Sequence, residues 1–293
     1  MAVRTIGVIG AGQMGAGIAQ VAAQAGLDVI LNDLSRDLVA RGVNGISRNL
    51  DRMIERGRFK PEERDKVLRR IEPSAKIDDF VRADFVVEAV VENEEVKIDL
   101  LQRLDRVCPP EVILASNTSS ISITRMGART NRADRVIGMH FMNPVPAMKL
   151  VEIIRGLATS EDTFLTTRAL AEQLGKNTMT AQDFPGFIVN RVLLPMINEA
   201  IYTLYEGVGG VTDIDTAMKL GTNQPMGPLE LADLIGLDTC LAIMEVMQRV
   251  LGDDKYRPCP LLKKYVDAGY LGRKSGRGFY KYDDRGNPIP PPH

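Results

Sequence analysis

The chain of 293 residues contains two histidines, and one of them stands where a proton-transfer group would be useful. His140 follows the apolar segment 136–139, whereas His293 ends a proline-rich tail. An imidazole has an unperturbed pKa of about 6.5, so it exchanges a proton near neutral pH. Ligands of open α/β sheets bind at the carboxyl ends of the strands. We therefore expect His140 to act as an acid or base.

Glu152 is the expected partner of that imidazole. A carboxylate on one ring nitrogen fixes the tautomer and favours the imidazolium that forms when the other nitrogen accepts a proton. The segment 150–154 around Glu152 is apolar, which predicts a largely buried carboxylate in need of a partner. The alternative is that Glu152 pairs with Lys149 or Arg155 at the surface.

A glycine motif at the start of the chain predicts a dinucleotide site. An apolar strand, 5–9, runs into Gly10-x-Gly12-x-x-Gly15 and a helix-forming segment, with Gln13 and Met14 inside the motif. The unpaired amides of the first helical turn would face the diphosphate. Asp33 follows the next apolar segment, where a carboxylate accepts from the adenosine 2′-hydroxyl and disfavours a 2′-phosphate. This favours NAD, although Arg36 nearby keeps NADP open.

Composition excludes several classes of protein. The 37 basic and 38 acidic residues give a net charge of −1, which argues against a general role in binding nucleic acid or membrane surfaces. The cysteines, Cys108, Cys240 and Cys259, lack metal-type spacing and suit a reducing compartment. No apolar run approaches the roughly 18 residues of a spanning helix, and the first strand leaves no room for a signal peptide. We expect a cytoplasmic protein without a metal.

The pattern of elements predicts an α/β fold with two domains. Apolar strand-like segments alternate with helix-compatible sequence up to about residue 183, which predicts a parallel, doubly wound Rossmann-type sheet. The expected strands are 5–9, 29–31, 85–91, 112–115, 136–139 and 151–154. Residues 35–71 predict an inserted helical hairpin, with Ser35 as a cap and Pro61 in a first turn. Residues 184–293 predict a smaller, all-helical domain whose apolar excess is core or subunit interface.

The motifs together resemble one enzyme family along nearly the whole chain. Besides the glycine motif, they are Val-Val-Glu-Ala-Val-Val-Glu-Asn (86–93), Ser-Asn-Thr-Ser-Ser (116–120), Gly-Met-His-Phe-Met-Asn-Pro-Val-Pro (138–146), Lys-Leu-Val-Glu (149–152), Pro-Gly-Phe-Ile-Val-Asn-Arg (185–191) and Lys-Ser-Gly-Arg-Gly-Phe-Tyr (274–280). In this order they resemble the L-3-hydroxyacyl-CoA dehydrogenases, and the size resembles the bacterial stand-alone enzymes of that family. On its own, the run 115–124 would be read as a helix cap or turn.

The resemblance implies roles for particular positions. His140 would be the acid/base and Glu152 would orient it, while Ser119 and Asn190 would hydrogen-bond the reacting oxygen. The implied cofactor contacts of the later motifs are Glu92, Lys97, Asn117, Asn143 and Lys274. Asn49 and Arg56 would contact the substrate, although the family often has Ser and Lys there.

Coenzyme A carries phosphates that bind cations, and Arg48, Arg52 and Arg56 recur at every fourth position of the predicted hairpin. Asp51 and Glu55 lie between them, so an ordinary ion-paired surface is the alternative.

We therefore expect reversible, NAD-dependent oxidation of a short-chain (3S)-3-hydroxyacyl-CoA, such as 3-hydroxybutyryl-CoA, by a homodimer that associates through its C-terminal domain. One alternative is a 3-hydroxyacid dehydrogenase acting on free acids, but that class uses a lysine on the first interdomain helix and none occurs between Phe184 and Gly207. The other is a non-catalytic nucleotide-binding protein of the same fold, in which His140 and Glu152 could be lost.

Overall fold

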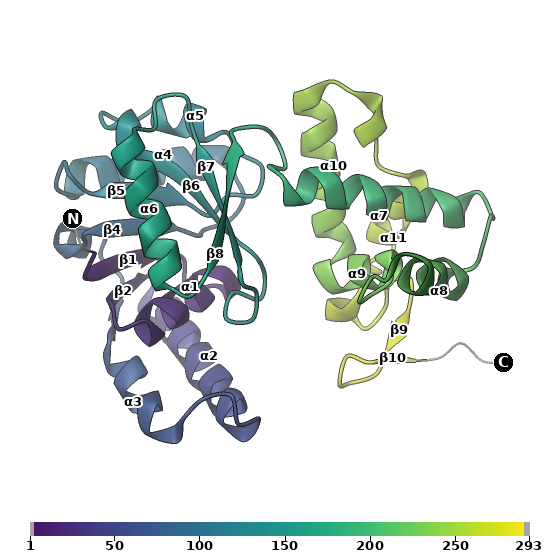
Figure 1. Ribbon diagram of the computed structural model, residues 1–293, viewed down its shortest axis with the longest axis horizontal. Coiled ribbons are helices and arrows are strands. Elements are labelled where there is room, and N and C mark those ends of the chain that lie inside the picture. The colour runs from purple at the N-terminus through teal and green to yellow at the C-terminus, as the bar shows by residue number, and fades with distance from the viewer. Residues whose placement is uncertain (1–2, 290–293) are drawn as a thin grey trace. The chain divides into compact units, whose positions relative to one another are not determined.

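The computed structural model describes residues 3–289 and divides into two compact units, Met1–Phe187 and Ile188–His293. The division falls a few residues after the expected boundary at residue 183. The first unit holds a large sheet with helices on both faces, and the second is mainly helical, as Figure 1 shows.

The sheet of the first unit has eight strands in the order β3-β2-β1-β4-β5-β6-β7-β8 among the described residues. Their bounds are β1 Thr5–Ile9, β2 Asp28–Asn32, β3 Ile71–Ser74, β4 Phe85–Glu88, β5 Ile113–Ser116, β6 Val136–Phe141, β7 Leu150–Arg155 and β8 Asn177–Gln182. The order reverses at β1, with β2 on one side and β4 on the other, as in a doubly wound sheet. The predicted α/β fold class is confirmed.

The prediction of a wholly parallel sheet is wrong at one side. Strand β7 runs antiparallel to β6, and β8 runs parallel to β7, so the last two strands oppose the first six. Only residues 142–149 connect β6 to β7. A parallel connection needs a dozen or more residues, so this short link forces the chain to turn back beside β6.

Two of the strands, β3 and β8, were not expected. Strand β3 contains Pro73 and lies at one edge, where a missing backbone donor is tolerated. Strand β8 lies at the other edge, and its sequence Asn-Thr-Met-Thr-Ala-Gln is largely exposed. Neither segment carries the apolar run by which the other strands were recognised.

Side chains alternate between the two faces of the sheet, and helices cover both. One face packs against α1 (Gln13–Gln24), α2 (Arg36–Glu55), α3 (Pro61–Arg69) and α6 (Glu161–Gln173). The other packs against the short helix η1 (Ile77–Arg82), α4 (Glu94–Val107) and α5 (Ile123–Gly127). The short helix η2 (Ala133–Arg135) leads into β6. The polar residues of the candidate site lie on this second face, at the strand ends.

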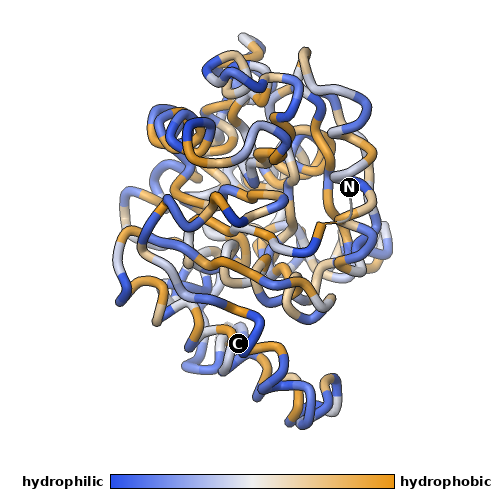
Figure 2. Tube along the Cα trace, turned by 90° about the vertical axis from the view of Figure 1, so that its left-hand side faces the viewer, coloured by the Kyte–Doolittle hydropathy of each residue, from blue (hydrophilic) through white to orange (hydrophobic). Residues whose placement is uncertain are grey.

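Helices α2 and α3 form the predicted hairpin, which projects from the bottom of the first unit (Figure 1). The Ser35 hydroxyl accepts from the Leu38 amide at 3.3 Å, and Pro61 occupies the first turn of α3. Hydrophilic and hydrophobic residues alternate along the hairpin (Figure 2), because only the side of α2 that carries Val39, Ile46 and Leu50 is buried.

The second unit packs five α-helices around one apolar cluster within its described residues. They are α7 Val189–Tyr205, α8 Val211–Thr222, α9 Pro228–Ile235, α10 Leu237–Leu251 and α11 Pro260–Asp267, with short helices η3 (Asp254–Tyr256) and η4 (Arg273–Ser275). It is not all-helical, because β9 (Lys281–Tyr282) pairs with β10 (Pro288–Ile289). Among residues 3–289, no helix is both long enough and apolar enough to cross a lipid bilayer.

Candidate active site

His140 and Glu152 face each other across two strands. They are directly paired in the antiparallel register of β6 and β7, so their side chains leave the sheet on the same face. The His140 Nδ1 atom lies 2.8 Å from Glu152 Oε2, and the Glu152 side chain is fully buried. His140 lies within β6 rather than after it. The surface alternative for Glu152 is wrong, since Arg155 instead pairs with Glu161.

Ser119 occupies the other side of the imidazole. Its Oγ lies 3.0 Å from His140 Nε2. When Glu152 is ionised it only accepts hydrogen bonds, so Nδ1 then donates to it, and Nε2 of a neutral imidazole is left as an acceptor. The Phe187 ring packs edge-on against the imidazole, with 5.5 Å between ring centroids. This arrangement presents a basic nitrogen, next to a hydroxyl, at the end of β6.

The segment that carries Ser119 is held by Glu92. One Glu92 oxygen accepts from the Ser119 amide at 2.8 Å, the Ser120 amide at 3.1 Å and the Thr118 hydroxyl at 2.6 Å. Asn117 fixes the start of the same segment, because its Oδ1 accepts from the Phe141 amide at 2.8 Å. The run 116–120 is therefore a turn held by side chains, and it also delivers a hydroxyl to His140.

Lys97 lies beneath this segment rather than on the surface. Its Nζ contacts Glu88 Oε1 at 2.6 Å, the Val90 carbonyl at 3.3 Å and Glu92 Oε2 at 3.4 Å, and its side chain is 1% exposed. Glu88 also accepts from the Ser116 hydroxyl at 2.6 Å. No role was predicted for Glu88 or Ser116. Both lie inside the quoted motifs 86–93 and 116–120, and Glu88 ends β4 although the expected strand ran on to residue 91.

The glycine motif has the geometry that its spacing predicts. Gly10 has φ of 97°, and a Cβ there would overlap the Ala89 carbonyl. A Cβ on Gly15 would collide with the Gly10 carbonyl, so α1 approaches β1 closely. At Gly12 a Cβ would meet no protein atom within 4 Å, and no side chain caps the first turn of α1. Open space therefore faces amides without side-chain partners, which fits a diphosphate.

Asp33 adjoins this loop in a hollow of about 340 Å³ formed by α1, α2 and the end of β2. Its carboxylate accepts from the Ala11 amide at 2.7 Å and the Leu34 amide at 2.7 Å, which fixes its orientation. The hollow has the residues that an adenosine ribose requires. Arg41 lines it beside Asp33, and Arg36 does not.

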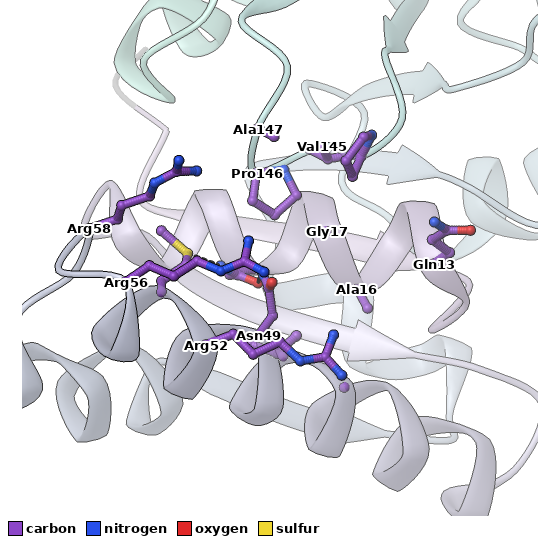
Figure 3. A pocket seen from close by; sticks show the side chains of 15 residues that line it. Gln13, Ala16, Gly17, Asn49, Arg52, Arg56, Arg58, Val145, Pro146 and Ala147 are labelled. Carbon is purple, nitrogen blue, oxygen red and sulfur yellow. Dashed lines mark hydrogen bonds between the residues drawn. The ribbon is translucent and has the colours of Figure 1, made fainter. Parts of the chain in front are cut away.

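A second and larger hollow, of about 680 Å³, lies between α1, α2 and the segment after β6. Arg52, Arg56 and Arg58 line it together with Asn49, and we call it the arginine pocket (Figure 3). None of the three guanidinium groups has an ion-pair partner within residues 3–289, and Asp51 pairs with Arg64 instead. The ion-paired alternative is therefore wrong for Arg52 and Arg56. Arg48 does not line this hollow.

Asn49 has a defined orientation in the arginine pocket. Its Nδ2 donates to Gln20 Oε1 at 2.8 Å, and Gln20 is itself buried in α1. The Asn49 carbonyl oxygen is left as the group available to a ligand. Gln20 was not expected from the sequence, and its position within a predicted helix gave no signal.

The segment after β6 forms the opposite wall of the arginine pocket, with Pro144, Val145, Pro146 and Ala147. Buried Lys176 supports it from behind, donating to the Val145 carbonyl at 2.6 Å and the Met148 carbonyl at 2.9 Å. Burial lowers the pKa of Lys176.

At the start of this segment, Gln13 Nε2 donates to Asn143 Oδ1 at 3.0 Å. This contact joins the glycine motif to the residues that follow β6. It brings together two of the predicted cofactor-binding side chains.

Two of the site residues predicted from the sequence are not part of the first unit. Asn190, in the first turn of α7, and Lys274, in η4, belong to the second unit. Lys274 pairs there with Asp238 at 2.5 Å. His293 lies outside the described residues. The roles of Asn190 and Lys274 remain predictions.

A phosphate-binding loop, an acidic residue for the ribose and an imidazole paired with a carboxylate are the parts of a nicotinamide-dependent dehydrogenase. The comparisons with known proteins make the class specific. Residues 5–184 match the NAD binding domain of 3-hydroxyacyl-CoA dehydrogenase, and residues 186–282 match its C-terminal domain. The chain belongs to the 3-hydroxyacyl-CoA dehydrogenase family, and NAD is its cofactor.

Relatives in this family are similar over nearly their full length. The chain is 58% identical to a probable 3-hydroxybutyryl-CoA dehydrogenase of Bacillus subtilis, covering 97% of this chain and 99% of that one. It is 58% identical to the 3-hydroxybutyryl-CoA dehydrogenase of Bradyrhizobium diazoefficiens, covering 98% of each. The crystal structure of (S)-3-hydroxybutyryl-CoA dehydrogenase from Ralstonia eutropha aligns with a TM-score of 0.93 at 51% identity, over 97% of this chain and 100% of that one.

Proposed function

We propose that this enzyme oxidises (3S)-3-hydroxybutyryl-CoA reversibly to acetoacetyl-CoA with NAD. The observation that carries the proposal is the Ser119–His140–Glu152 chain, with contacts of 3.0 and 2.8 Å. Relatives at 58% identity are named for this substrate, which supports the short acyl chain. Reduction of acetoacetyl-CoA is the same reaction in reverse.

The proposed steps begin from the contacts that the first unit holds among Ser119, His140 and Glu152. His140 Nε2 removes the proton from the substrate hydroxyl, and Glu152 stabilises the resulting imidazolium through Nδ1. Ser119 and Asn190 hydrogen-bond the reacting oxygen. Bound NAD supplies the hydride acceptor. Glu92, Lys97, Asn117, Asn143 and Lys274 are proposed to position the cofactor, directly or through their neighbours.

The arginine pocket is the proposed site for the coenzyme A portion. Phosphates form strong, charge-assisted hydrogen bonds with guanidinium groups. Arg52, Arg56 and Arg58 have no protein carboxylate as an ion-pair partner in the described chain, so a phosphorylated ligand would supply their missing charge. The Asn49 carbonyl oxygen adds one acceptor for a ligand N–H or O–H group.

Substrate choice is tested by comparing acetoacetyl-CoA with free acetoacetate as substrates. The oxidation of NADH is followed by the absorbance of the reduced nicotinamide. We expect turnover with the thioester and at most trace activity with the free acid. Comparable rates on both would favour the free-acid alternative. No turnover of either by folded, NADH-binding protein would favour the non-catalytic alternative.

We also propose a homodimer that forms through the second unit. A hollow of about 470 Å³ between α7, α8 and α9 is lined mainly by apolar residues, including Met196, Ile214 and Met218. Leu220 and Val208 are 83% and 74% exposed on the same unit. Exposed apolar surface of this kind marks interaction sites. Sedimentation equilibrium at micromolar concentration should give twice the chain mass, and the mass of one chain would contradict the proposal.

A further inference from the structure

A buried ion pair outside the catalytic residues lies at the end of β4. Glu88 and Lys97 contact each other at 2.6 Å, with side chains 0% and 1% exposed. Glu88 also accepts from the Val90 amide at 2.7 Å and the Ser116 hydroxyl at 2.6 Å. Its carboxylate is therefore bonded on both oxygens, and the proposed chemistry does not use it.

Stability alone is a weak reason for such a pair. Removing two charges from water is costly, and apolar replacements of similar volume are often neutral or stabilising. The pair is also unlike the surface ion pairs of this unit, such as Arg82 with Glu72, in which both side chains are 52% exposed. A role in placing neighbouring groups is the remaining physical explanation.

Two paths of contacts lead from this pair to Ser119. In the first, Lys97 Nζ lies 3.4 Å from Glu92 Oε2, and the other Glu92 oxygen accepts from the Ser119 amide at 2.8 Å. In the second, the Ser116 hydroxyl donates to Glu88 and accepts from the Thr118 amide at 3.2 Å. The segment 116–120 is thus held from both sides by groups that Glu88 orients.

The register of the sheet explains why these groups meet. Glu88 and Ser116 are paired neighbours at the ends of β4 and β5, and both leave the sheet on the face that carries His140. The Glu88 carbonyl also accepts from the Asn117 amide at 2.8 Å. The ion pair is therefore continuous with the strand ends from which Ser119 departs.

We propose that Glu88, acting through Lys97, Glu92 and Ser116, is a positioning residue that holds the Ser119 hydroxyl against His140. Glu88 does not touch the reacting atoms. This inference rests on the proposed function, because Ser119 matters only if it contacts the reacting oxygen. In this proposal Lys97 also has a role as a buried side chain, which it exerts through its contact with Glu92.

The test replaces the pair by uncharged side chains of similar size. Glu88→Gln alone leaves a buried ammonium without its counter-ion, so the variant to measure is Glu88→Gln with Lys97→Met. We expect it to fold and to lose about 10- to 100-fold in kcat, as a small misplacement of a reacting group can cause. The matched control is Asp105→Asn with Arg132→Met, which removes both charges of the buried Asp105–Arg132 pair (2.7 Å) elsewhere in the same unit and should retain kcat per folded molecule.

A double-mutant cycle separates positioning from general structural damage. If Glu88 acts through Ser119, the paired variant should add no further loss in a Ser119→Ala background. A full additional loss in that background, or normal kcat in the folded paired variant, would overturn the inference.

A second measurement does not depend on turnover. With ¹⁵N-labelled histidine, the His140 Nε2 resonance should shift in the paired variant toward its position in Ser119→Ala. The control variant Asp105→Asn with Arg132→Met should leave it in place. An unchanged resonance would also overturn the inference. Wild-type protein that fails to turn over acetoacetyl-CoA would contradict the proposed function instead, since this spectrum would still report the placement of Ser119.

Discussion

Two regions of the first unit differ in whether their polar and charged side chains have partners within the protein. At the sheet crest, formed by Glu88, Ser116, Ser119, His140 and Glu152, each of these side chains has a protein partner within 3.0 Å. In the arginine pocket, three guanidinium groups have no ion-pair partner in the described residues, although they line a hollow of about 680 Å³. One region is complete without a ligand, and the other has charges left for one.

The difference separates chemistry from binding. Groups whose orientation is fixed before the substrate arrives spend no free energy on reorganisation during the reaction. Unpaired cations gain their partners only when an anionic ligand binds, so they contribute to affinity. Substitutions at the crest should therefore change kcat, and substitutions in the arginine pocket should change KM.

The largest effect is expected at the crest. His140→Gln or Glu152→Gln should lower kcat by about a thousandfold or more, because the first removes the base and the second removes the group that fixes its tautomer. NADH affinity, measured by fluorescence titration, should change little. Near-normal turnover in either variant would show that the pair is structural.

The next effect should appear as a KM change. Arg56→Gln and Arg52→Gln should each raise the KM for acetoacetyl-CoA about tenfold or more, the value of one lost hydrogen bond to a charged group. Their kcat should stay close to that of the wild type. Arg48→Gln is the matched control, since Arg48 lies on the same helix but outside the pocket. A fall in kcat with unchanged KM would remove the distinction between the two regions.

A smaller effect is expected on cofactor choice. Asp33→Asn removes the charge that disfavours a 2′-phosphate but keeps a carbonyl acceptor, so the preference for NADH over NADPH should fall by about tenfold. Arg41 lines the same hollow. Adding Arg41→Gln should abolish the gain with NADPH. If the double variant keeps that gain, another cation binds the 2′-phosphate.

The fold and the crest could largely be predicted from the sequence because their signals are local. The glycine motif and the apolar strands can each be recognised within a few residues, and the rarity of histidine left one candidate base. The resemblance to the family then linked His140 to Ser119. The antiparallel direction of β7 follows from the short connection 142–149, which the alternation of strands and helices did not take into account. The edge strands β3 and β8 escaped notice because an edge strand need not be apolar.

The contacts that hold the site in place could not be predicted, because they join distant segments. Gln20 meets Asn49 only because α1 packs against α2, and Lys176 meets the Val145 carbonyl across 31 positions of the chain. The expected strand 85–91 placed Glu88 in its middle rather than at its end, and nothing in the sequence indicated its partner Lys97. A pattern in one segment does not specify the side chain that another segment will bring to it.

The smallest expected effect is the contribution of Lys176 to stability. This cation lies behind the arginine pocket and, unlike the arginines, donates to two protein carbonyls. Its pKa is lowered because the charged ammonium is buried. Between the lowered pKa and the ordinary value of about 10.4, the unfolded chain binds more protons than the folded one, so this group makes stability rise with pH in that window. Below the lowered pKa the full penalty of the buried charge is present.

Lys176→Met removes this contribution and therefore isolates it from other groups that titrate in alkali. Urea titrations give the unfolding free energies of the wild type and of Lys176→Met between about pH 8 and about pH 10.5, the range set by the lysine pKa. The value for the wild type minus the value for the variant should increase with pH. Lys149→Met is the control, because Lys149 is an exposed lysine just before β7. A difference that stays flat or falls with pH would mean that the two carbonyls stabilise the ammonium as well as water does.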